Sequence, residues 1–346
     1  MIHRRRRLAC RPQAVSAGVV DVASLFDVVG MQTIEILRPF TLADLRRLGL
    51  TRQRLRTLIR HGDIRRVVSG VYAPTALGDS LEVRAQAVAL VLGDGHVACD
   101  RTAAWLHGIS IYPYAEHDSW PEVEMCVGPG RSASTSDGIG GHRRTLLPSE
   151  VMDLHGVPVT TPLRTAVDLA CILERRDAMA ALDAFRRMHG LNRTDLVQLA
   201  RRRFAGRRGV IQARFLIEHS DPRAESHRES WARIAIIDAG LPTPEPQVWI
   251  VVDGVPTYRL DLAYRRKRIA IEYDGFDAHE ADEESVRVTE DRRVWLRDNG
   301  WTVIVIRNGD FTGARLDRWI GELVRALRPT FTNRRALERG ARVREF

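Results

Sequence analysis

Two acidic residues stand inside apolar stretches in the last third of the sequence. Asp261 lies within Arg259–Ala263, and Glu272 follows eleven residues later within Ile269–Tyr273. Both stretches have the aliphatic composition of β-strands. A carboxylate inside such a strand costs several kcal/mol unless it is paired or bound to a metal ion. The two residues therefore predict a site that uses their charge.

Adjacent strands would bring both carboxylates to one divalent ion. Mg²⁺ (or Mn²⁺) prefers oxygen ligands and leaves coordination positions for water and phosphate. We therefore expect Asp261 and Glu272 to hold this ion and to support phosphodiester hydrolysis. The alternative is an ion pair between either acid and an arginine of the turn at 265–268.

The elements that must position these acids can be read from the flanking pattern. A helix over 226–239 precedes three strands at 248–252, 258–264 and 269–273. A charged helix over 283–298, an apolar strand over 301–306 and a helix over 315–327 follow. The order αβββαβ predicts helices packed on a mixed sheet.

Residues 225–328 resemble the PD-(D/E)XK nuclease superfamily, in the branch related to very-short-patch-repair endonucleases. The resemblance is carried by an ordered set: Ser226–Ser230, Asp261, Glu272-Tyr273-Asp274-Gly275, His279 and Asp291-Arg292-Arg293. It implies a restriction-endonuclease-like fold. It also implies a metal ion held by Asp261 and Glu272, with help from Glu229 on the preceding helix.

One position departs from that superfamily. The usual lysine after the second acid, which would orient the attacking water, is replaced by Asp274. Asp274 is then a candidate ligand or base, and His279 is a candidate for activating the water. The departure equally favours a domain that binds DNA without cutting it. A third, weaker possibility is RNA cleavage, because the acids do not distinguish the two sugars.

The front of the chain has a different pattern, which predicts a winged helix-turn-helix over 31–76. Thr41 and Asp44 resemble a capping pair for a first helix that ends at Gly49. A second helix runs from Thr51 to His61, and two short strands at 64–68 and 71–73 follow around Ser69-Gly70.

The second helix carries a basic stripe. Arg52, Arg56 and Arg60 recur every four residues, with Gln53 beside the first, opposite a face formed by Leu55, Leu58 and Ile59. In a recognition helix this stripe would face the major groove. Arg65 and Arg66 would lie on the wing against phosphate or the minor groove. The alternative is a solvated basic face used for protein contact.

Residues 40–190 resemble AbiEi-type antitoxins. The front end carries this in Gly62-Asp63-Ile64 and Ser69–Pro74, and the middle in Arg101–Gly108 and Gly156–Thr165. The resemblance implies an operator-binding regulator with a possible toxin partner. Asp168, four residues after Arg164, is expected to form a structural pair with it. Gly128–Gly141 is expected to be loop.

Composition agrees with a nucleic-acid partner. The 346 residues carry a net charge of +9, and Lys267 is the only lysine. Arginine suits bidentate contacts to phosphate and guanine, although a genome rich in G and C would enrich it too. The four cysteines form no CxxC pair and no stretch is long enough to span a bilayer, so we expect a reducing, cytoplasmic location.

The predicted organisation is α/β (α+β) and multidomain. A leader at 1–30, poorly ordered or preceding a true start at Met31, is followed by the winged helix-turn-helix at 31–76, a mixed α/β middle region at 77–220, the nuclease-like domain at 221–330 and a basic tail at 331–346. The leading hypothesis is a DNA-binding endonuclease. The alternative is a non-catalytic antitoxin-type transcriptional regulator, and the sequence leaves the oligomeric state open.

Overall fold

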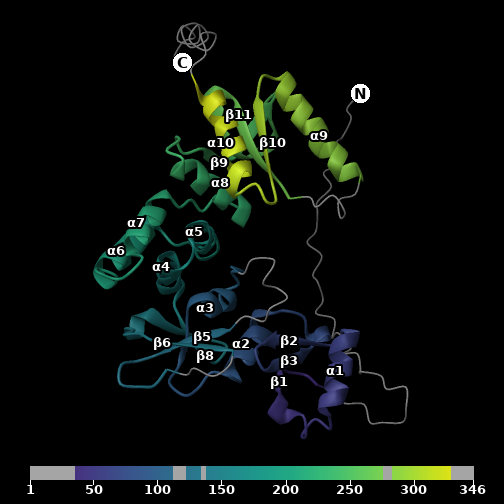
Figure 1. The fold of residues 1–346 in the computed structure, drawn as a ribbon, viewed down its shortest axis with the longest axis vertical. Coiled ribbons are helices and arrows are strands. Elements are labelled where there is room, and N and C mark those ends of the chain that lie inside the picture. The colour runs from purple at the N-terminus through teal and green to yellow at the C-terminus, as the bar shows by residue number, and fades with distance from the viewer. Residues whose placement is uncertain (1–35, 112–121, 134–137, 276–282, 329–346) are drawn as a thin grey trace, which may run out of the picture.

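The structure is a computed structural model that describes residues 36–111, 122–133, 138–275 and 283–328. Its helices and three separate sheets confirm a mixed α/β chain built from several parts. Figure 1 shows the winged-helix region at one end of the long axis, helices α4–α7 in the middle and the C-terminal sheet at the other end. The predicted leader, the predicted tail and His279 lie outside the described residues.

The winged-helix region folds around a three-stranded sheet in the order β1-β3-β2. Its elements are β1 (Phe40–Thr41), a 3₁₀ turn (Leu42–Asp44), α1 (Arg52–His61), β2 (Ile64–Val68) and β3 (Val71–Pro74). The predicted bounds of α1 are confirmed: the Thr51 hydroxyl accepts the Arg54 N–H at its start, and Gly62 ends it in the left-handed conformation with φ +82°.

The predicted first helix is wrong. The Asp44 carboxylate accepts hydrogen bonds from the Thr41 N–H at 2.8 Å and the Thr41 hydroxyl at 2.9 Å, as a capping pair should. Only a 3₁₀ turn over Leu42–Asp44 follows, and the chain continues as a turn to Gly49 although Leu45 is buried. The small core of this region instead consists of Ile36, Phe40, Leu45, Leu50, Leu55, Leu58 and Ile64.

The middle region has a five-stranded sheet in the order β6-β5-β4-β8-β7. The elements are α2 (Leu81–Ala89), β4 (Val97–Ala98), α3 (Asp100–Leu106), β5 (Val123–Val127), β6 (Ile139–Arg143), β7 (Val151–Leu154) and β8 (Val157–Thr160). The predicted loop 128–141 ends early, because β6 begins at Ile139 and pairs in parallel with β5. The glycine-rich composition of 128–141 predicts a loop, so it does not reveal this strand. The strand pairs through its backbone and does not depend on its side chains.

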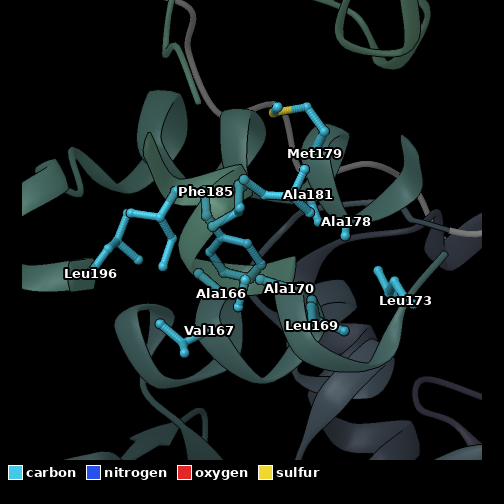
Figure 2. Close-up of a cluster of buried hydrophobic side chains, with 14 of the residues drawn as sticks. Ala166, Val167, Leu169, Ala170, Leu173, Ala178, Met179, Ala181, Phe185 and Leu196 are labelled. Atoms are coloured by element: carbon cyan, nitrogen blue, oxygen red, sulfur yellow. The ribbon is translucent and has the colours of Figure 1, made fainter. Parts of the chain in front are cut away.

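Four helices connect this sheet to the C-terminal part. They are α4 (Pro162–Ile172), α5 (Arg175–His189), α6 (Arg193–Arg203) and α7 (Val210–His219). Their apolar faces meet in one core, in which Phe185 of α5 lies among alanines of α4 and Leu196 of α6 (Figure 2). Small alanine side chains allow α4 and α5 to approach closely, which holds the middle of the molecule as one unit.

The C-terminal part confirms the predicted order αβββαβ. Its elements are α8 (His227–Asp238), β9 (Glu245–Val252), β10 (Val255–Tyr264), β11 (Ile269–Asp274), α9 (Glu283–Asp298), β12 (Thr302–Arg307) and α10 (Gly313–Leu327). The sheet order is β12-β11-β10-β9. Strands β11 and β12 are parallel, and the other neighbours are antiparallel.

A buried ion pair joins the C-terminal part to the helical middle. Arg233 of α8 and Asp183 of α5 are each 1% exposed and bonded to each other, and Ser230 adds a hydrogen bond of 2.8 Å to the same Asp183 oxygen. Losing one partner would leave a buried charge uncompensated, so this pair ties α8 firmly to α5.

No helix among the described residues is long and apolar enough to cross a membrane.

Candidate functional site

The basic stripe on α1 has the orientation that the sequence predicts. Leu55 and Leu58 are buried in the local core, whereas Arg52, Arg56 and Arg60 are exposed. Gln53 is also exposed, next to Arg52. Within the described ranges no carboxylate pairs with the three arginines. The prediction fails only at Ile59, which is 38% exposed rather than inward.

The placement of arginine at the start of α1 works against the helix. Arg52 is the first helical residue, and the first turn contains no acidic residue. The N-terminus of a helix carries partial positive charge, so a cation there is unfavourable by a few tenths of a kcal/mol or more. An anion bound at this end would reverse that sign. Arg52 at the helix start therefore favours the binding of a phosphate or a base edge more than it favours the stability of the helix.

The wing arginines are placed differently from the expectation. Arg65 donates to the Gly78 carbonyl and lies 4.0 Å from Asp79. Arg66 donates to the Val68 carbonyl at 3.3 Å and to the Ser69 hydroxyl at 2.9 Å. Both side chains are half-buried against their own chain. Contact with DNA by Arg65 or Arg66 would require these side chains to leave these partners.

The two strand acids of the C-terminal part do lie together. In the register of β10 and β11, Leu262 faces Ile271, so Asp261 and Glu272 are the next opposing positions. One Asp261 oxygen accepts the Tyr273 backbone N–H at 2.9 Å, which ends the strand ladder with a side chain. Glu272 is 1% exposed. The two acids are therefore close to each other, as adjacent strands predict; their role stays a prediction.

The charge partner of Glu272 comes from a distant helix. Arg292 of α9 donates to Glu272 at 2.6 Å, and Arg293 lies 3.9 Å from the same oxygen. Arg293 also contacts Asp274 at 3.2 Å. These are not the arginines of the 265–268 turn that the sequence offered. Their helical spacing gave no signal for this role, because only the packing of α9 on the sheet aims them inward.

The remaining candidate ligands are partly engaged elsewhere. Glu229 is buried, with one carboxylate oxygen accepting from Gln247 at 2.8 Å and from the Glu225 N–H at 3.0 Å. The other Glu272 oxygen has no hydrogen-bond partner. Across the described part of the chain, no three His, Cys, Asp or Glu side chains come close enough to hold a metal ion. Arg292 donates to one Glu272 oxygen, so in this structure these residues form an ion-pair network.

Like charges and burial perturb the pKa of Asp261. The pKa of Asp261 is raised from 3.8 to about 7, mainly by burial; the carboxylates of Glu229 and Glu272 add to the rise, and the Tyr273 N–H and Arg292 oppose it. Burial also raises the pKa of Glu272, against the attraction of Arg292 and Arg293. The folded chain thus favours protonated Asp261 near neutral pH.

We expect Asp261→Asn to stabilise the chain at alkaline pH. The folded pKa of about 7 lies above the ordinary value of 3.8, so folded protein binds a proton that unfolded protein has released. Wild-type stability should therefore fall as pH rises through this window, and the asparagine variant should lack that loss. Urea unfolding at a series of pH values measures this, with Asp317→Asn on exposed α10 as control. A wild type more stable than the variant above about pH 7 would contradict the assignment.

The predicted pair of Arg164 and Asp168 is confirmed as structural, within a larger buried network. Arg164 is 0% exposed and donates to Asp168 at 2.7 and 3.2 Å and to Glu150 at 2.9 Å. Arg203 holds the other Glu150 oxygen at 3.0 Å. This network joins α4, α6 and the turn before β7, a role that spacing could predict only for the pair within α4.

Comparison with known proteins places the first two parts of the chain. Residues 35–75 match the family described as "Transcriptional regulator, AbiEi antitoxin", and residues 96–219 match the family described as "AbiEi antitoxin C-terminal domain". These ranges contain the winged-helix region with α1, and the middle region from β4 to α7. These two parts of the chain are therefore similar to AbiEi antitoxin domains.

Two curated proteins match at greater length. They are the uncharacterized proteins MT2308 and Rv2248 of Mycobacterium tuberculosis, from strains CDC 1551 / Oshkosh and ATCC 25618 / H37Rv. Each is 35% identical over 263 residues, which cover 74% of this chain and 90% of the relative. The chain belongs to the same protein family as these two mycobacterial proteins.

Proposed function

We propose that the chain is a DNA-binding transcriptional regulator of the antitoxin type, which reads DNA through α1 and does not require catalysis. The observation that carries this proposal is the exposed stripe of Arg52, Arg56 and Arg60 on a helix within the regulator match. The stripe meets no carboxylate of the described chain, so its charge is available for phosphate and guanine.

The antitoxin matches also favour a protein partner. Antitoxin families are so described because a toxin is counteracted, and the second match covers the whole helical middle of the chain. We therefore include a cognate toxin among the proposed partners, beside DNA.

Selection from a random duplex pool tests DNA reading. Wild-type chain should enrich a short consensus sequence, because bidentate side-chain contacts discriminate each base pair by about 1–3 kcal/mol. Arg56→Ala should relax the consensus at one position. Recovery of an unbiased pool by wild-type chain would exclude sequence reading by α1.

A second candidate is metal-dependent phosphodiester hydrolysis in the C-terminal part. It rests on a specific observation: Asp261 and Glu272 occupy opposing strand positions, and one Glu272 oxygen is buried without a partner. The contact of Arg292 with Glu272 argues against it. Strand breaks in DNA or RNA that depend on Mg²⁺ or Mn²⁺ and vanish in Asp261→Ala would favour this candidate.

A further inference from the structure

A second basic surface lies far along the chain from α1. The 22 residues from Leu196 to Ile217 contain no aspartate or glutamate and six arginines: Arg201, Arg202, Arg203, Arg207, Arg208 and Arg214. This stretch forms the end of α6, the connection and most of α7. A run of such charge is often a solvated helix face. The contacts of each arginine show whether it has a structural role or is available for a ligand.

Two of these arginines have roles in packing. Arg203 pairs with Glu150 at 3.0 Å, and Arg207 lies over the ring of Phe204 at 5.0 Å. The Phe204 ring contacts the guanidinium of Arg207 but carries no negative charge, so the positive charge of Arg207 is not neutralised by it. Arg201, Arg202 and Arg208 are exposed, and the described residues provide no ion pair for them. We call Arg201, Arg202, Arg207 and Arg208 the arginine corner.

The helix dipole accounts for only half of the corner. Arg201 and Arg202 lie in the last turn of α6, where a cation offsets the negative end of the helix. Arg207 and Arg208 instead precede the first turn of α7, which contains no acidic residue. Cations are unfavourable there, as they are at Arg52 on α1. The helix dipole therefore does not explain Arg207 and Arg208, and only Arg207 has a packing contact, with the Phe204 ring.

The backbone of the arginine corner has a defined conformation at Gly209. Gly209, at the start of α7, has φ +82°, and a Cβ there would lie 2.0 Å from the Cys171 carbonyl oxygen of α4. The connection is thus packed directly on the backbone of α4. A hollow of about 300 Å³ adjoins the α6 side of the corner at Arg202; its lining also includes Ser149, Gln198 and the carboxylates of Glu150 and Asp195, of which Glu150 is paired with Arg164 and Arg203. Hydroxyl, amide and guanidinium groups are all donors to phosphate oxygens.

We propose that the arginine corner is a second duplex-DNA surface, which binds backbone phosphates without reading sequence. Several neighbouring arginines that have no carboxylate partner among the described residues suit a polyanion with regularly spaced charges. Figure 1 places α6 and α7 well away from α1, so one short duplex would not reach both surfaces. This inference rests on the proposed function, because the corner is expected to hold DNA flanking the segment that α1 contacts.

The experiment compares two quadruple alanine variants of the full chain. One removes Arg201, Arg202, Arg207 and Arg208. The matched control removes four arginines that do pair with carboxylates, at 2.7 to 3.2 Å: Arg223, Arg259, Arg265 and Arg297. Both variants lose the same charge, so a difference between them reports contact rather than net charge. Affinity is measured by fluorescence anisotropy on duplexes of about 12 and about 40 base pairs, from about 50 to 200 mM salt.

We expect the corner variant to bind the long duplex with a log–log salt slope smaller by about 3.6, since each of the four lost phosphate contacts removes about 0.9. The control should change the slope by less than about 1, and on the short duplex the two variants should agree. Equal slopes for both variants on the long duplex would overturn the inference. If the wild type and Arg52→Ala/Arg56→Ala bind the short duplex equally, the proposed function fails instead, which separates the two failures.

Discussion

Replacing Arg164 with methionine is expected to destabilise the chain by about 3–5 kcal/mol, which is the usual cost of removing one member of a buried ion pair. The Arg164 guanidinium is fully buried and satisfies Asp168 and Glu150 together. Methionine fills much of the same volume but leaves the two carboxylates without that partner. Arg144, which lies 3.3 Å from Asp168, would compensate only part of the loss.

Chemical denaturation measures this free energy of unfolding. Arg223→Met is the matched control, because Arg223 pairs with Asp221 at 2.8 Å on the surface and is 58% exposed. An exposed pair contributes about 0–1 kcal/mol. If Arg164→Met cost no more than this control, the network would not stabilise the middle region as its geometry indicates.

The double substitution Arg52→Ala/Arg56→Ala is expected to weaken duplex binding at least about tenfold and to lower the salt slope by about 2. Both side chains project from the exposed face of α1, so their removal should leave the fold intact. Circular dichroism checks the fold, and anisotropy at several salt concentrations checks binding.

Arg47 provides a control within the same region. It pairs with Asp44 at 2.6 Å, so its charge is already compensated. Arg47→Ala should leave both affinity and salt slope nearly unchanged. Equal losses in Arg47→Ala and in the double variant would show that general charge, and not the α1 stripe, governs binding.

Prediction from the sequence succeeded where a residue's own neighbours determine its environment. The apolar stretches around Asp261 and Glu272 predict adjacent strands, and the structure places the two acids in opposing register. The caps at Thr51 and Gly62 likewise set the limits of α1. These features depend on local hydrogen bonds and on alternation within a strand, both of which are visible in a short window of sequence.

Prediction failed where packing between distant elements decides. Arg292 meets Glu272 across twenty residues because α9 lies on the sheet, and no spacing rule indicates which face of α9 turns inward. The first predicted helix is a short 3₁₀ turn in the structure, where Leu45 is buried but Leu42 remains 42% exposed. Tertiary contacts therefore supplied an arginine partner for Glu272 that no local pattern indicates.

The most direct test of the account is one incubation in which both binding and strand integrity are followed. Supercoiled and linear duplex DNA is mixed with wild-type chain in Mg²⁺, Mn²⁺ or EDTA, beside Arg52→Ala/Arg56→Ala and Asp261→Ala. We predict that wild type and Asp261→Ala bind the DNA and leave its strands intact under every condition. The Arg52→Ala/Arg56→Ala variant should not bind the DNA. Metal-dependent strand breaks that disappear in Asp261→Ala, or retention that is unaffected by the α1 substitutions, would contradict a regulator that binds through α1 without cutting.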